Sequence, residues 1–206
     1  LEEYGADVTR AYLMFMGPYE GDVTWSTEAI NGAKRFVAKF YTFLIQAWEK
    51  RDDSLQDSSD VAKLIKKIEE DIIAFKFNTA ISALMQFYNS NQSKKFSSKD
   101  IERLILTIAP ILPHIAEELW DITGHEFSVH TQDWPEIDEK LLIDKEIEIP
   151  VQVNGKVKGK MVVSFDITQE DLEAKLLTDD SFAEIFKEQK PKKIIYIPQK
   201  IVSVVI

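Results

Sequence analysis

The sequence predicts a multi-domain α plus α/β protein, in which an all-α helical bundle is followed by a small mixed α/β domain. Apolar residues recur at helical spacing over about residues 5–122, and they alternate at strand spacing from about residue 146 onward. The charge changes at the same place: residues 1–150 hold 16 basic and 27 acidic side chains, whereas residues 151–206 hold 9 and 8. We therefore expect a helical bundle over residues 1–125, a linker over residues 126–145 and an α/β domain over residues 146–206.

Local signals divide the first half of the bundle into helices. A first helix is predicted to stop at Gly17-Pro18, and Ser26 is a suitable N-cap for a long second helix. A third helix begins near Ser59. The sequence leaves open whether the apolar stretch after it is a separate fourth helix. We favour a turn near Phe75–Asn78, because it lets two helices pack antiparallel.

The last helix of the bundle is predicted from about Ser98 to Ile122, with Ser97 as its N-cap. Pro110 and Pro113 should kink this helix or break it into two, because proline lacks the amide proton that a helix interior needs. The predicted core of the bundle consists of the residues on the inward stripes of these helices: Phe40, Trp48, Leu64, Ile68, Leu84, Ile105 and Leu112.

The second part begins with a hairpin whose register depends on its turn. A two-residue turn pairs Val153 with Lys156 and would place lysines on the apolar face. A three-residue loop pairs Val153 with Val157 and keeps the apolar residues together, so we expect that loop. The elements predicted after the hairpin are a helix over Thr168–Leu177, a short helix over Ser181–Glu188, and strands over Lys193–Ile197 and Ile201–Ile206.

Composition excludes several classes of protein. The 206 residues are 45% hydrophobic with a net charge of −10, which is ordinary for a folded globular protein. The absence of cysteine excludes disulfides, thiolate nucleophiles and cysteine-ligated zinc. No apolar run reaches the roughly 18 residues of a membrane helix. Because the chain begins at Leu1 with no signal-peptide pattern, we expect a cytoplasmic fragment of a longer chain with no membrane partner.

Motifs for catalysis are missing from the sequence. It contains no phosphate-binding loop, no nucleophile elbow and no glycine fingerprint that opens a helix after a strand. Gly155 and Gly159 open a strand instead, which favours a hairpin. The three histidines are predicted to be structural, because they are not spaced as converging metal ligands: His114, His125 and His130. We expect no catalytic residue, no metal and no cofactor in this chain.

The remaining chemical signal is basic. Lysines cluster along the predicted strands of the second part: Lys156, Lys158, Lys160, Lys192, Lys193 and Lys200. Such a surface can neutralise phosphates of a nucleic acid. Lysines on a sheet edge also prevent aggregation, and the residues alone leave these two interpretations equally open.

Several segments resemble a known family. Residues 4–7, followed by Arg10 and then Trp25-Ser26, resemble the stretch just after the catalytic signature loop of class I aminoacyl-tRNA synthetases. Residues 75–85 and 109–120 are similar to helices of their anticodon-binding bundle. Val151–Lys160 together with Lys193–Val202 resembles the C-terminal domain of bacterial-type leucyl-tRNA synthetases. The resemblance covers essentially the whole chain. It implies that the bundle is of the class I synthetase anticodon-binding type.

The resemblance also implies a function. Such an enzyme uses ATP and magnesium to join leucine to tRNA(Leu), and its catalytic and editing domains would lie elsewhere in the same chain. We expect a monomer that contacts the anticodon stem, the elbow and the variable arm of the tRNA. The candidate tRNA-binding residues are Lys156, Lys158, Lys160, Lys193, Lys200, Arg35 and Lys39. The alternative is a helical protein–protein interaction scaffold with no role in RNA binding.

Overall fold

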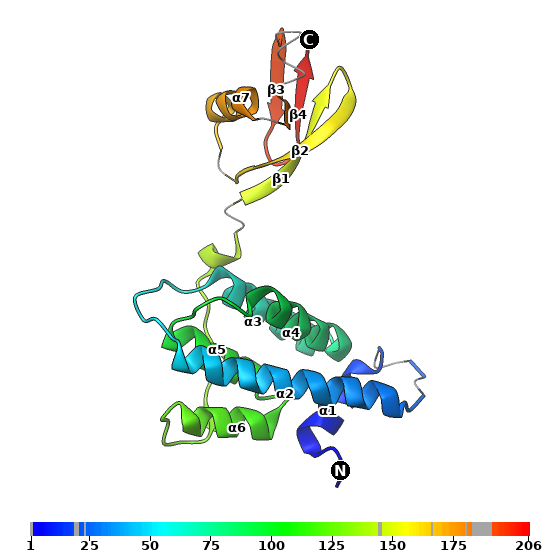
Figure 1. Ribbon diagram of the computed structural model, residues 1–206, viewed down its shortest axis with the longest axis vertical. Coiled ribbons are helices and arrows are strands. Elements are labelled where there is room, and N and C mark those ends of the chain that lie inside the picture. Colours follow the sequence, from blue (N-terminus) through cyan, green and yellow to red (C-terminus); the bar gives the residue numbers. More distant parts are fainter. Residues whose placement is uncertain are drawn as a thin grey trace. The chain divides into compact units, whose positions relative to one another are not determined.

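The computed structural model describes residues 2–18, 21–22, 24–143, 146–165, 167–179, 181–182 and 191–206. The chain forms two compact units, Leu1–Leu142 and Ile143–Ile206. The first unit is helical, and the second contains a small mixed sheet with one helix drawn beside it (Figure 1). The predicted change from helices to strands is therefore confirmed.

Helices make up the first unit, and the two N-caps that the sequence predicts are both present. Ser26 Oγ accepts a hydrogen bond of 3.2 Å from Ala29 N, and Ser97 Oγ accepts one of 3.2 Å from Asp100 N. Within the described residues the elements are α1 (Ala6–Phe15), α2 (Thr27–Glu49), α3 (Ser59–Ile73), α4 (Phe77–Asn91), α5 (Ser98–Ile108), α6 (Pro113–Ile122) and the 3-10 turns η1 (Val129–Thr131) and η2 (Glu139–Leu142).

Both predicted interruptions are present. Phe75, between α3 and α4, has a φ of 55°, which no helix interior allows, so α3 and α4 are separate helices. The Pro110–Pro113 segment separates α5 from α6, and Pro113 occupies the first turn of α6, where its missing amide proton costs nothing. One core holds the helices together. Six of the seven predicted core residues are buried, whereas Trp48 is half-buried beneath the Arg51 guanidinium, 4.2 Å from its ring.

Residues 126–142, which the sequence assigned to a linker, belong to the helical unit. Val129 is 2% exposed, and Trp134 and Ile137 pack against the same core. Glu117 Oε2 fastens this segment by accepting hydrogen bonds from Val129 N (3.0 Å) and Ser128 Oγ (2.9 Å). Short 3-10 turns have no long apolar period, which is why the pattern did not reveal the packing.

The second unit is a four-stranded sheet with the strand order β2-β1-β4-β3. Its central pair, β1 and β4, is parallel, and the two outer pairs are antiparallel. Leu172 and Leu176 of the helix pack in the same core as the inward residues of the sheet. The elements are β1 (Glu146–Val153), β2 (Lys156–Ser164), α7 (Gln169–Thr178), β3 (Lys193–Ile197) and β4 (Ile201–Val205). Most of the predicted helix over Ser181–Glu188 lies outside the described residues.

The predicted hairpin loop is wrong, because the turn has two residues. Asn154 and Gly155 have φ values of 48° and 79°, as a type I′ turn requires, and Val153 pairs with Lys156. The register then shifts, since Val151 pairs with Gly159 and Lys158 is an extra residue in β2. This β-bulge places Met161 and Val163 on the same face as Val151, as the three-residue loop was expected to do, but it leaves Val157 exposed.

Candidate nucleic-acid interface

Three of the predicted lysines lie at the turn end of the sheet. Lys156 directly follows the β1–β2 turn, and Lys158, the bulged residue, lies two positions further along β2. Lys193 reaches the same end from the other side, because it pairs with Val205 of β4 and β4 runs parallel to β1. All three side chains are exposed, and none has an ion-pair partner among the residues that the structure describes. We call Lys156, Lys158 and Lys193 the turn-end lysines.

The other two predicted lysines of this unit lie elsewhere. Lys160 pairs with Pro150, and Lys200 lies in the turn before Ile201, at the same level of the sheet. Along β1 this level is three residues from the turn, or about 10 Å at about 3.3 Å per strand residue, and Lys158 lies between the two. Lys160 Nζ also forms an ion pair of 2.7 Å with Glu148 Oε2, so part of its charge is already compensated. The lysines that the sequence predicted to form one cluster therefore lie at two different levels of the sheet.

The predicted bundle residues lie on α2, where Arg35 and Lys39 are exposed one turn apart. Lys39 lines a hollow of about 340 Å³ between α2 and α4, whereas Arg35 does not. A second hollow of about 140 Å³ shares Phe43, Gln46 and Gln92 with the first and so extends it. We call the two hollows together the α2–α4 groove. Its lining also includes polar and basic residues that sequence reasoning did not select: Thr42, Lys50, Tyr88, Ser93, Lys94 and Lys95.

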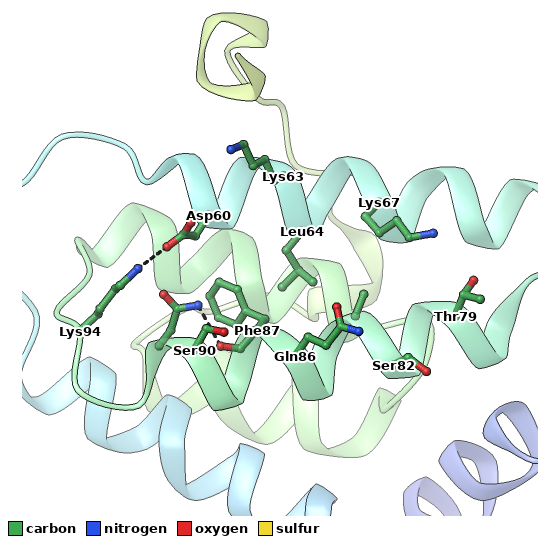
Figure 2. A pocket seen from close by; sticks show the side chains of 12 residues that line it. Asp60, Lys63, Leu64, Lys67, Thr79, Ser82, Gln86, Phe87, Ser90 and Lys94 are labelled. Atoms are coloured by element: carbon green, nitrogen blue, oxygen red, sulfur yellow. Dashed lines mark hydrogen bonds and ion pairs between the residues drawn. The ribbon is translucent and has the colours of Figure 1, made fainter. Parts of the chain in front are cut away.

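A larger groove of about 620 Å³ lies between α3 and α4, and we call it the α3–α4 groove. Its basic residues are Lys63, Lys67 and Lys94. Lys67 Nζ lies 2.7 Å from Asp71 Oδ1, and Lys94 forms an ion pair with Asp60 that crosses one end of the groove (Figure 2). Carboxylates therefore compensate much of the positive charge in this groove.

The motif residues near the N-terminus hold helices together. The Asp7 carboxylate accepts hydrogen bonds from Ile115 N (2.7 Å) and His114 N (3.3 Å) and lies 2.8 Å from His114 Nδ1. It thereby caps the start of α6 from α1, although the two helices are about a hundred residues apart. Arg10 Nη2 donates to the carbonyl of Pro110 at 2.8 Å. Asp7 and Arg10, which belong to the motif that resembles the synthetases, therefore stabilise the packing of α1 against the start of α6.

Two further findings concern other kinds of site. Among the described residues, no three histidine or acidic side chains come together as ligands for a metal ion. None of the described helices is both long enough and apolar enough to cross a membrane.

The geometry is thus a helical bundle joined to a small sheet with exposed lysines at one end. Residues 58–174 match the family described as the anticodon-binding domain of tRNA ligase. The match covers more than half of the chain, which therefore belongs to this family. Its resemblance to leucyl-type relatives is confirmed as well, because curated leucine–tRNA ligases align with 99–100% of it.

Two of these relatives are bacterial. The leucine–tRNA ligase of Herpetosiphon aurantiacus is 39% identical over 216 residues, and that of Bacteroides thetaiotaomicron is 37% identical over 212. The chain spans only 26% and 22% of their lengths. A similar solved structure is a ternary complex of the Agrobacterium radiobacter K84 LeuRS with tRNA and LeuAMS. It has a TM-score of 0.76 and 26% identity, over 99% of this chain and 29% of that one.

Proposed function

We propose that this chain is the tRNA-binding part of a leucine–tRNA ligase, which positions tRNA(Leu) while other domains of the same protein attach leucine. One observation carries the proposal: leucine–tRNA ligases are 37–39% identical to this chain over practically its whole length. The similar solved structure is a LeuRS bound to tRNA, which supports the same role. It also disfavours the alternative of a helical protein–protein scaffold without RNA.

The two units have separate tasks in this proposal. The bundle acts as an anticodon-binding-type domain along the anticodon stem, with Arg35 and Lys39 as candidate contacts. The small α/β domain reaches the elbow and the variable arm, with the turn-end lysines as its first candidates. Lys160 and Lys200 are further candidates. Contacts of this kind act on phosphates, so they fix the position of the RNA without reading its bases.

The chemistry belongs to the rest of the ligase. The parent protein uses ATP and magnesium to activate leucine, edits its product, and acts as a monomer in the cytoplasm. No step of that reaction is assigned to residues of this chain. Its contribution is to hold the tRNA so that the acceptor end can reach the catalytic domain, which lowers the entropic cost of the transfer step.

A truncation of the full-length ligase tests this role. Removing residues 144–206 should leave leucine-dependent ATP–pyrophosphate exchange near the wild-type rate, because that step needs no tRNA contact from this unit. Leucylation of tRNA(Leu) should fall sharply, through a raised KM for tRNA. Leucylation that remains at the wild-type rate and KM would contradict the proposal.

A further inference from the structure

We infer that the α2–α4 groove is a second RNA-backbone site, which binds a sugar–phosphate strand of the same tRNA on the helical unit. The inference rests on the proposed function and deepens it, because it locates the contact between the bundle and the tRNA in one groove. Lys39 is the one residue of the groove that was a sequence candidate. Lys50, Lys95 and the polar lining are new.

The charge around the groove is unusual for this chain. Residues 29–48, which form most of α2, contain no aspartate or glutamate, and neither do residues 72–99, which include all of α4. At the average of 35 acidic residues in 206, these 48 residues would hold about eight. Both hollows of the groove are accordingly lined without a single carboxylate among the described residues. In a chain of net charge −10, the groove therefore lacks the carboxylates that would repel an anion.

The spacing of the lysines suits a polymer. Lys39 lies on α2 and Lys50 is the C-cap of the same helix, eleven residues further on, which is about three helical turns and about 16 Å along one face. Both are exposed, and neither forms an ion pair within the described part of the chain. Lys95 joins the lining at the Lys50 end. A single phosphate could reach only one end of this row, whereas a nucleic-acid strand can follow it.

Neutral polar groups fill the space between the charges. Thr42, Gln46, Gln92 and Ser93 present hydroxyl and amide groups, which suit ribose hydroxyls and phosphate oxygens. Tyr88 forms part of the wall, and its ring is held edge-on to Phe43 at a centroid distance of 5.6 Å. The lining can thus contact both the charged and the neutral parts of an RNA backbone.

The neighbouring α3–α4 groove is larger but less suitable. Its Lys67 is paired with Asp71, and Asp60, which lines this groove and not the other, is paired with Lys94, a residue that both grooves share (Figure 2). A phosphate that binds there must break these ion pairs or approach the carboxylates. The α3–α4 groove has the larger volume, but carboxylates near it would repel a phosphate. We therefore expect the RNA backbone to bind in the α2–α4 groove.

The test uses the full-length ligase with the double substitution Lys39→Ala and Lys50→Ala. The matched control is Lys63→Ala with Lys66→Ala on α3, which removes the same charge from outside the groove. The dissociation constant for tRNA(Leu) is measured over a series of salt concentrations for both variants and the wild type. Two lost phosphate contacts should reduce the salt slope by about 1.4–1.8, and the control should keep the wild-type slope. A Lys39→Arg, Lys50→Arg variant should also keep it.

The outcomes separate this site from the proposed function. If the wild type binds tRNA and the groove variant binds with the same affinity and slope, the groove is not an RNA site, although the proposed function stands. Equal losses in the groove variant and the control would show a general effect of charge and would also overturn the inference. If the wild type itself fails to bind tRNA(Leu), the proposed function falls and the inference falls with it. Leucine-dependent ATP–pyrophosphate exchange should be unchanged in every variant that folds.

Discussion

Single side chains join distant helices in the first unit, and Asp7 is the clearest case. Its carboxylate is 7% exposed and serves both backbone amides at the start of α6. Asp7→Ala removes this cap and leaves those amides without their partner, so it should lower the free energy of unfolding by about 1–3 kcal/mol. Urea unfolding measures this change. Asp121→Ala, an exposed change at the other end of α6, should stay within about 0.5 kcal/mol, and an equal effect of both substitutions would mean that the cap is unimportant.

Asp57 should make folding depend on pH. Hydrogen bonds from Lys99 Nζ (2.9 Å) and Arg103 Nη1 (2.7 Å) lower the pKa of its carboxyl below the ordinary value of 3.8. The charged form is thus favoured in the folded state, so its contribution is present above that value and is lost as the pH falls through the lowered pKa. Asp57→Asn should cost about 0.2–1 kcal/mol at pH 7 and almost nothing below the lowered pKa.

Urea unfolding of both proteins at several pH values measures this difference. Asp100, 3.7 Å from the same Arg103, behaves in the opposite way, because burial raises the pKa of its carboxyl. The comparison should therefore be made between Asp57→Asn and wild type at each pH, so that the titration of Asp100 largely cancels. A difference that does not shrink in acid would contradict the proposed role of Asp57.

At the scale of the helix pair, α3 and α4 pack against each other through buried side chains of the main core. Leu64 of α3 is 5% exposed and belongs to the main core. Leu64→Ala should lower the free energy of unfolding by about 2–5 kcal/mol, from lost apolar burial and the cavity left behind. Ile73, on the same helix but 73% exposed, is the control and should change stability little when replaced by alanine. An unchanged urea midpoint for Leu64→Ala would remove this residue from the core.

At the scale of the hairpin, the bulge at Lys158 sets which face is apolar. Deleting Lys158 moves Gly159, Met161 and Val163 by one position, which exchanges the two faces of β2. The deletion should abolish the cooperative unfolding of the small unit, whereas Lys158→Ala keeps the residue count and should fold. Thermal unfolding followed by circular dichroism distinguishes the two variants. A deletion variant as stable as Lys158→Ala would show that the register is not set by the bulge.

These elements also show what the sequence could and could not reveal. Helix starts at Ser26 and Ser97 and the break near Pro113 follow from local chemistry, so they were predictable. The hairpin turn was not, because a bulge is a third solution that alternation alone does not suggest. The parallel pairing of β1 with β4 joins residues about fifty positions apart, and it is this pairing that separates Lys200 from the turn-end lysines. The two grooves beside α4 could not be predicted, because they form only where α2, α3 and α4 pack together.

At the scale of the whole molecule, the isolated chain should be catalytically silent. Its sequence lacks the motifs with which class I synthetases bind ATP. We expect the purified 206-residue chain to show no leucine-dependent ATP–pyrophosphate exchange, with the full-length ligase as the positive control. Exchange above background would place a catalytic site in this chain and would refute the assignment of the chemistry to other domains.

The most direct test of the central claim, that this chain binds tRNA through backbone phosphates, is the salt dependence of tRNA(Leu) binding. It compares the full-length ligase with its triple variant Lys156→Ala, Lys158→Ala, Lys193→Ala. At about 0.7–0.9 per phosphate contact, the loss of three contacts should lower the slope by about 2.1–2.7. Lys160→Ala, which removes a lysine already paired with Glu148, should change it by less than one contact. Affinity should fall about equally for all tRNA sequences, whereas an unchanged slope and affinity would make these lysines simple guards of the sheet edge.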